Sequence, residues 1–168
     1  MIRTAAELEA LATKVLMKAG TAETAARSVA KALVRANADG LNSHGLARLK
    51  AYSAQVAAGK VAGEAVPLLE NLGPSAARID AKDGFAFPAF DMAIDALVEM
   101  IGETPVAGIA VTNSHHFGVA GHHVERLAEK GLVGLVFGNS PAGIAPWGGS
   151  RPLFGTNPIA FGFPRAQD

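Results

Sequence analysis

One segment of the chain joins an apolar run to a helix-like pattern: Asn113-Ser114-His115-His116-Phe117-Gly118-Val119-Ala120-Gly121-His122-His123. We call it the histidine stretch. It contains four of the five histidines of the chain. An apolar run over residues 106–111 precedes it, and a helix-like pattern over residues 124–130 follows it. A strand that passes through a glycine-bearing turn into a helix suits ligand binding, because the helix start offers unpaired N–H groups and positive potential. We therefore expect the histidine stretch to line an active site.

The fifth histidine, His44, lies far upstream in Ser43-His44-Gly45-Leu46-Ala47-Arg48, and we expect this segment to form the other side of the same site. If Ser43 caps a helix, His44 is the first helical residue and Arg48 lies one turn on, on the same face. Ser43 can then hydrogen-bond the imidazole or the helix N–H groups. The positive helix end would keep His44 from being permanently charged.

These side chains suit the reduction of a 2-oxo acid. The guanidinium of Arg48 can hold the carboxylate through two hydrogen bonds. The imidazole of His44 can give a proton to the carbonyl oxygen as a hydride arrives at the carbon. The alternative is a plain helix start, with Ser43 as its cap and Arg48 in solvent.

The residues of the histidine stretch leave three interpretations. His115 or His116 could bind a metal ion with His122 or His123, but no carboxylate lies between the two pairs and adjacent histidines point in different directions. The backbone of residues 117–121 could instead hold a phosphate or a nicotinamide, with His116 near the substrate. The third interpretation is a strand end with partly buried polar histidines.

Later loops offer further polar groups, but no common nucleotide motif. Trp147 could stack on a ligand, and Thr156 or Asn157 could hydrogen-bond to one; a structural loop is the alternative. The 19 glycines include no two that are separated by a single residue, so the Gly-x-Gly-x-x-Gly motif of the Rossmann fold is absent.

Composition excludes several classes of protein. Lys plus Arg and Asp plus Glu both number 15, so the zero net charge gives no electrostatic case for nucleic acid or an anionic membrane. Cysteine is absent, which excludes disulfides and thiolate metal sites. The start lacks an apolar signal core, and no apolar run is long enough to cross a bilayer. We expect a cytoplasmic protein that binds neither nucleic acid nor membrane.

Residues 1–62 are predicted to form a helical domain of three helices. Thr4 and Glu7 make a capping box for the first helix, Thr21 caps the second and Ser43 the third. The predicted inner faces are, in the first helix, Leu8, Leu11, Val15 and Leu16; in the second, Ala22, Ala26, Val29, Ala30, Leu33 and Val34; and in the third, Leu46, Leu49 and Val56.

Residues 63–168 are predicted to form a mixed α/β domain, so the fold class is α/β. The strands expected lie at 66–69, 76–80, 106–112, 132–137 and 158–163, and the helices at 88–100 and 119–130. We expect the domain to be incomplete at its C-terminus, because the chain stops soon after a strand with no capping element.

Four motifs follow one another along nearly the whole chain. They are Asp39-Gly40-Leu41-Asn42-Ser43-His44-Gly45 with Arg48, Asn113-Ser114-His115-His116-Phe117-Gly118, Ala145-Pro146-Trp147-Gly148-Gly149, and Pro152-Leu153-Phe154-Gly155-Thr156-Asn157-Pro158-Ile159-Ala160. In this combination and order, they resemble the type-2 malate/L-lactate dehydrogenase family of NAD(P)-dependent oxidoreductases. That family includes ureidoglycolate, sulfolactate and diketogulonate enzymes, and reductases of Δ1-piperideine- and Δ1-pyrroline-2-carboxylate.

The resemblance implies a role for particular residues. Ser43 and His44 are implied to be catalytic, with His44 as the proton donor. The implied substrate contacts are Arg48, His116 and Thr156. The implied cofactor contacts are His44, Phe117, Gly118, Val119, Ala120, Gly121 and Ser140, and no metal is implied. The resemblance also implies NAD or NADP as cofactor, a homodimer, and a nicotinamide-binding fold unlike the Rossmann fold, which agrees with the missing glycine motif.

The resemblance leaves the reaction open in two respects. The substrate is expected to be a small 2-oxo or 2-hydroxy acid of the malate/lactate type, with a cyclic imino acid, Δ1-piperideine- or Δ1-pyrroline-2-carboxylate, as the alternative. Family members are substantially longer, so the chain is expected to be an N-terminal portion. It would then be an inactive fragment or a subunit that needs a separate C-terminal polypeptide. We assign no role to Asp168, the last residue.

Overall fold

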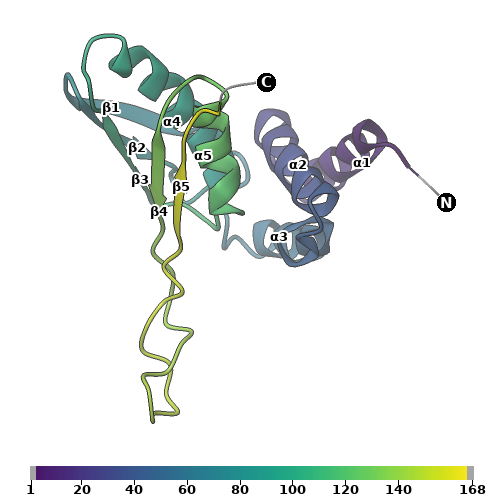
Figure 1. Cartoon of the computed structure of the whole chain (residues 1–168). Coiled ribbons are helices and arrows are strands. Elements are labelled where there is room, and N and C mark those ends of the chain that lie inside the picture. Colours follow the sequence, from purple (N-terminus) through teal and green to yellow (C-terminus); the bar gives the residue numbers. More distant parts are fainter. Residues whose placement is uncertain (1–2, 166–168) are drawn as a thin grey trace. The chain divides into compact units, whose positions relative to one another are not determined.

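The computed structural model describes residues 3–165, and Asp168 lies outside these described residues. The chain forms two compact units, residues 1–118 and residues 119–168. Helices and small mixed sheets confirm the α/β class (Figure 1). None of the helices among the described residues is both long and apolar enough to cross a bilayer.

The boundary between the units differs from the domain boundary predicted after residue 62. The hydrophobic core explains the difference, because Phe85 and Phe87 are buried in the same cluster as Leu33 and Tyr52 of the helical part. The helical part at the N-terminus and the first sheet therefore belong to one unit.

Three helices open the first unit: α1 (Ala5–Lys18), α2 (Glu23–Ala38) and α3 (Leu49–Ala57). The predicted capping box is confirmed, since the Thr4 N–H donates to Glu7 Oε2 at 2.8 Å and the Glu7 N–H donates to Thr4 Oγ1 at 3.3 Å. The predicted stripe of α1 is partly wrong: Leu16 is fully buried, but Leu11 is 52% exposed. The buried face of α1 instead passes through Ala12.

The inner face predicted for α2 is confirmed except for Ala22, which precedes the helix and is only partly buried, and the predicted cap is wrong. The buried residues of α2 include Ala26, Val29, Ala30, Leu33 and Val34. The cap position is Ala22, which provides no side-chain hydrogen bond, and the buried Thr21 hydroxyl has no partner among residues 3–165. The Ala22 N–H instead donates to the carbonyl of Gly63 at 3.0 Å.

The prediction that Ser43 starts the third helix is wrong. Two short 3₁₀ turns, η1 (Asn42–His44) and η2 (Leu46–Arg48), precede α3, which begins at Leu49. The side chain of Asn37 takes the place of the predicted cap, because its Oδ1 accepts the Leu46 N–H at 2.6 Å, a donor that Ser43 would bond as an N-cap. His44 therefore does not lie at the start of an α-helix, and the helix-dipole argument does not apply to it.

A three-stranded sheet completes the first unit, with the order β1 (Leu68–Gly73), β2 (Ala76–Asp80), β3 (Gly108–Thr112). β1 is antiparallel to β2, and β3 is parallel to β2 after the crossover helix α4 (Ala86–Ile101). β1 begins later than predicted, because Pro67 has no N–H for a ladder. The expectation of a buried strand from Val106 is also wrong: Val106 is exposed and no residue of β3 is fully buried.

The second unit consists of α5 (Ala120–Ala128) and the antiparallel hairpin of β4 (Gly134–Phe137) and β5 (Ile159–Gly162). α5 contacts both strands, and Gly134 and Gly162 allow this close approach, because a Cβ on either would press against Leu127 or Val124. The connection between the strands, residues 138–158, extends as a long arm (Figure 1).

Candidate active site

The turn that carries Ser43 and His44 is fixed to helix α2 through Asn37. The amide of Asn37 donates to Asn42 Oδ1 at 2.7 Å and accepts from the Leu46 N–H at 2.6 Å. Gly45 is required between these bonds, because a Cβ there would overlap the Asn37 side chain. The backbone on either side of His44 is thereby held in place.

The strand ends of β2 and β3 hold the histidine stretch in place. Backbone hydrogen bonds continue past the strands, with the Asp83 N–H donating to Asn113 O at 2.8 Å and the His115 N–H donating to Gly84 O at 3.0 Å. Asp80 accepts from the Lys82 N–H at 2.8 Å and from the Asn113 amide at 3.0 Å, and these bonds lower the pKa of Asp80 to about 2. The turn before His115 is thus tightly bonded.

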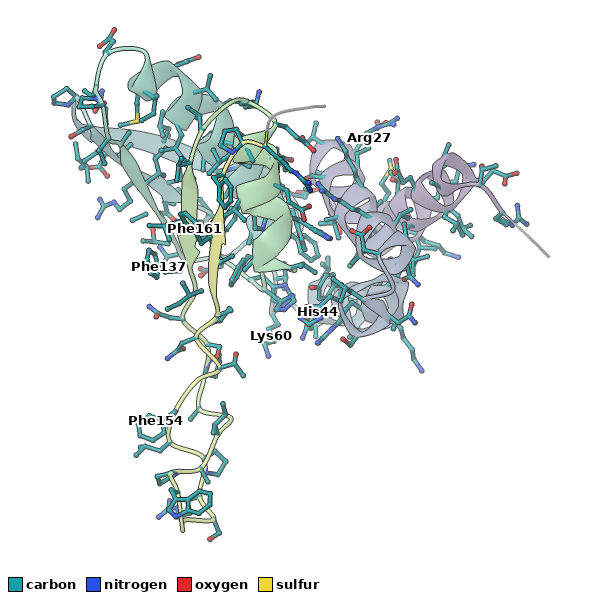
Figure 2. The ribbon with its side chains drawn as sticks, viewed as in Figure 1. Arg27, His44, Lys60, Phe137, Phe154 and Phe161 are labelled. Carbon is teal, nitrogen blue, oxygen red and sulfur yellow. The ribbon has the colours of Figure 1, made fainter. Side chains whose placement is uncertain are left out.

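The structure brings His44 and His116 together, from segments that are far apart in the sequence. Their ring centroids lie 5.5 Å apart. Ser43 Oγ lies 3.1 Å from His44 Nδ1, so the serine bonds to the imidazole, one of the two partners expected for it. The Tyr52 hydroxyl lies 2.7 Å from His116 Nδ1. Figure 2 shows His44 beside the helices of the first unit.

Arg48 lies beside these rings with its terminal nitrogens uncommitted. Its Nε–H donates to the carbonyl oxygen of Ser43 at 2.6 Å, which fixes the stem of the side chain. Within residues 3–165, no carboxylate pairs with Arg48 and its terminal nitrogens make no hydrogen bond. The guanidinium can therefore bind an anionic ligand.

The electrostatics of the site favour neutral histidine rings and an anionic ligand. Burial, followed by the charges of Arg48, His44 and His115, lowers the pKa of His116 to about 4. Burial, Lys60 and Arg48 likewise lower the pKa of His115. All the charged neighbours that act on these two rings are cationic, so a carboxylate would enter a positive environment.

The predicted cofactor segment runs across the junction of the two units. Phe117 stacks on Phe90 with ring centroids 5.5 Å apart, and Gly118 adopts φ +77° against Phe87. The remaining residues, Val119, Ala120 and Gly121, form the cap and first turn of α5. Val119 caps α5 without a side-chain hydrogen bond.

Ser140 and Thr156 lie side by side at the base of the arm in the second unit. Their hydroxyl oxygens are 3.0 Å apart, and the Thr156 N–H donates to Ser140 Oγ at 2.8 Å. Asn157 completes the arrangement, because its Oδ1 accepts the Ser140 N–H at 3.0 Å. Trp147 is fully exposed on the arm, and its ring stacks on no other ring among the described residues.

Sequence reasoning missed Tyr52 and Asn37. Tyr52 is the only tyrosine of the chain and follows Arg48 by four residues, so both lie on one helical face; that spacing could have indicated it. Its contact with His116 joins residues 64 positions apart, which no local pattern reveals. His115, considered as a metal ligand or as a partly buried polar residue, packs edge-on against Tyr52 with ring centroids 5.0 Å apart.

The metal interpretation finds no ligand set in the structure. Among residues 3–165, no three His, Asp or Glu side chains gather as metal ligands. Instead, His116 uses its Nδ1 for the Tyr52 hydroxyl and the Gly118 N–H.

The chain is similar to known dehydrogenases and reductases. The (2R)-3-sulfolactate dehydrogenase (NADP(+)) of Chromohalobacter salexigens is 48% identical over 159 residues, which are 95% of this chain and 47% of that protein. A Δ1-pyrroline-2-carboxylate/Δ1-piperideine-2-carboxylate reductase of Pseudomonas syringae pv. tomato is 42% identical over 91% of this chain and 45% of that protein. The chain thus spans about half the length of the curated relatives it matches.

Solved structures give the same result. The Δ1-piperideine-2-carboxylate reductase from Pseudomonas syringae pv. tomato superposes with a TM-score of 0.94 at 39% identity, over 100% of this chain and 51% of that one. The malate dehydrogenase from Pyrococcus horikoshii OT3 gives a TM-score of 0.90 at 33% identity, over 99% and 48% of the two chains.

The protein has an α/β fold in which two segments bring histidine rings and an arginine together. These groups suit a small carboxylate. More particularly, residues 4–168 match the malate/L-lactate dehydrogenase family, and the chain belongs to that family. The resemblance of its motifs is thereby confirmed.

Proposed function

We propose that this chain carries the proton-donating and substrate-binding residues of an NAD(P)-dependent oxidoreductase. The reaction is hydride transfer between the nicotinamide and a small 2-oxo or 2-hydroxy acid. The observation that carries the proposal is the approach of His44 to His116, at 5.5 Å, beside an Arg48 that has no carboxylate partner among residues 3–165.

His44 is proposed as the proton donor. A hydride added to C2 of a 2-oxo acid moves the carbonyl electron pair onto oxygen, and that oxygen then takes a proton to give the 2-hydroxy acid. His44 is accessible enough to reach a ligand, and Ser43 orients its ring from Nδ1. The other ring nitrogen then serves the substrate oxygen.

Arg48 is proposed to bind the substrate carboxylate. Its stem is fixed to Ser43, so the planar fork is held ready for two parallel hydrogen bonds. We propose that Thr156 provides a second substrate contact through its hydroxyl, which is held by Ser140.

The residues present fit a nicotinamide cofactor, NAD or NADP, which supplies the hydride when bound. The start of α5 offers N–H groups that no capping side chain occupies, and such a helix start favours phosphate. Gly118, at φ +77°, lets the backbone turn close to Phe87 just before that helix. We propose that residues 117–121, His44 and Ser140 contact the cofactor.

The substrate class has two candidates. A 2-hydroxy acid is favoured by the 48% identity to a sulfolactate dehydrogenase. A cyclic imino acid is the second candidate, since several relatives at about 40% identity are Δ1-pyrroline-2-carboxylate reductases. In that case the hydride goes to the imine carbon and the ring nitrogen takes the proton.

We also propose that further protein completes the enzyme. The hairpin of the second unit exposes Leu135, Phe137, Ile159 and Phe161 on one face, each more than half exposed. Apolar surface of this extent needs cover. We propose that a second copy of the chain, as a homodimer, and a polypeptide corresponding to the rest of the relatives provide it.

The test is a substrate panel with the complete protein. NADP⁺ or NAD⁺ reduction is measured with sulfolactate, malate and lactate, and NADPH or NADH oxidation with Δ1-piperideine- and Δ1-pyrroline-2-carboxylate. The proposal expects turnover with at least one 2-substituted carboxylate. Turnover only with substrates that lack a carboxylate, or none with any member of the panel, would contradict it.

A further inference from the structure

We infer that Tyr52 is a positioning residue that fixes the tautomer of His116, so that His116 meets the substrate as a neutral Nε2–H donor. The inference rests on the proposed function in one respect only, namely that the acceptor of this N–H is a substrate oxygen. The state of the His116 ring follows from contacts within the first unit alone.

The tautomer follows from the backbone. The Gly118 N–H donates to His116 Nδ1 at 3.3 Å, so Nδ1 presents a lone pair and carries no proton. In a neutral imidazole the proton then resides on Nε2. The Tyr52 hydroxyl, 2.7 Å from the same Nδ1, must therefore be a donor in this bond.

Among residues 3–165, the Tyr52 hydroxyl has no hydrogen-bond partner other than His116. Tyr52 is 2% exposed, and its ring lies 5.6 Å from the ring of Phe85 and 6.5 Å from that of Phe87. Burial raises the pKa of Tyr52 to about 12, so the phenol keeps its proton. If this phenol accepted from Nδ1, its own buried O–H would have no acceptor among the described residues, so donation to the imidazole is the favoured arrangement.

The surroundings of His116 keep the ring neutral. Burial disfavours the imidazolium most, and the titratable groups that act on the ring, Arg48, His44 and His115, each disfavour it as well. Nε2 makes no hydrogen bond among residues 3–165. It therefore remains available to a ligand, whereas Nδ1 is fully engaged.

A neutral N–H donor has a distinct use beside a proton donor. As a hydride reaches the substrate carbon, negative charge builds on the oxygen, and a donor already aimed at that oxygen stabilises it. His44 can transfer the proton, while His116 polarises the same bond and keeps its own proton. Tyr52 acts through His116 and does not itself touch the substrate.

The first test reads the tautomer without substrate. We would record ¹⁵N NMR spectra of the imidazoles in the 168-residue chain, with the His116 signals assigned by their loss in His116→Gln. The inference expects an unprotonated Nδ1 and a protonated Nε2 near neutral pH. A protonated Nδ1 in the unaltered chain would overturn the inference, whether or not the protein proves to be an oxidoreductase.

The second test removes the hydroxyl alone. Tyr52→Phe keeps the buried ring, and Ser53→Ala is the matched control, because it deletes a neighbouring hydroxyl that has no hydrogen-bond partner among the described residues. In Tyr52→Phe we expect a mixture of His116 tautomers and a higher His116 pKa, and in Ser53→Ala neither. Spectra of Tyr52→Phe identical to those of the unaltered chain would overturn the inference.

The kinetic consequence is measured in the complete enzyme. Loss of one hydrogen bond of this kind should lower kcat about three- to tenfold, with a smaller change in KM. The acid limb of the kcat/KM profile should move to higher pH in Tyr52→Phe and stay in place in Ser53→Ala. An equal loss in both variants would show a packing effect and overturn the positioning role, while an inactive unaltered enzyme would count only against the proposed function.

Discussion

Arg48 shows at the scale of one residue how the structure separates a binding group from a structural one. Its Nε is committed to the Ser43 carbonyl, and its terminal nitrogens have no partner among residues 3–165. Arg78, by contrast, pairs with Glu70 on the sheet. The first arrangement holds a guanidinium ready for a ligand, and the second stabilises a strand pair.

Arg48→Lys should therefore weaken substrate binding more than catalysis. A lysine cannot present two parallel donors to a carboxylate. We expect KM for the carboxylate substrate to rise by on the order of tenfold, with kcat changed less. Steady-state kinetics measure this, with Lys50→Arg on the adjacent exposed position as the control. An unchanged KM would remove Arg48 from the substrate site.

The partly buried rings of His115 and His116 predict acid sensitivity of the fold. The pKa of His116 is about 4 in the folded chain and near 6.5 when unfolded, and that of His115 is also lowered. Between these values the unfolded chain binds more protons, so the free energy of unfolding falls as the pH drops from about 6.5 toward 4. Because the His116 ring is only partly buried, we expect a loss on the order of 1 kcal/mol.

Urea unfolding at several pH values measures this loss. His116→Gln should flatten part of the pH dependence, and replacing the exposed Lys130 with Gln should leave it unchanged. A His116→Gln profile parallel to that of the unaltered chain would show that His116 is protonated equally in both states.

At the scale of elements, the link between α2 and the turn of His44 decides the site. Gly45→Ala places a Cβ about where the Asn37 amide lies, 2.7 Å from its Cγ. The amide must move and release the Leu46 N–H. We expect a loss of roughly 1–3 kcal/mol in unfolding free energy and a lower kcat.

Gly108→Ala is the control for this change, since nothing lies within 4 Å of the added Cβ. Thermal unfolding compares the two variants. Equal stability of both would show that the Asn37 contact does not hold the turn.

The elements also show which features a sequence can predict. The capping box at Thr4 follows from local chemistry, and its prediction is confirmed. Gly20 and Gly40, both with positive φ, likewise follow directly after the C-caps of α1 and α2. The start of α3 was predicted wrongly, because Oδ1 of Asn37, a residue of α2, accepts the Leu46 N–H. Local sequence patterns predict that an element forms. Competition of a distant side chain for a backbone hydrogen bond shifts the residue at which the element begins.

The candidate site was predictable to the extent that its motifs are local. Ser43 beside His44 is a contact of neighbours, which spacing alone suggests. The pairing of Tyr52 with His116 depends on how α3 meets the end of β3. The tertiary fold, and not the pattern of either segment, creates that contact.

At the scale of the whole molecule, the second unit exposes most of the large apolar side chains of its hairpin. Phe137 and Phe161 are 68% and 59% exposed, and Phe154 on the arm is 53% exposed (Figure 2). The arm, residues 138–158, carries Arg151 as its only charged side chain. Exposed apolar surface of this extent supports the proposal that further protein binds here.

We expect the 168-residue chain alone to self-associate through this face. Phe137→Ser with Phe161→Ser should lower the apparent mass in sedimentation at equal concentration. Val66→Ser, at a position 74% exposed in the first unit, is the control. Unchanged association in the double variant would place the interface elsewhere.

The central claim, that His44 donates the proton in a hydride transfer from NAD(P)H, is tested most directly by isotope transfer. The complete enzyme is supplied with reduced nicotinamide cofactor that carries deuterium at both C4 positions and with the accepted carboxylate substrate. The account predicts deuterium at C2 of the product, and a rate that falls at least about a hundredfold in His44→Ala while cofactor binding persists. Product without deuterium, or an unchanged rate in His44→Ala, would contradict it.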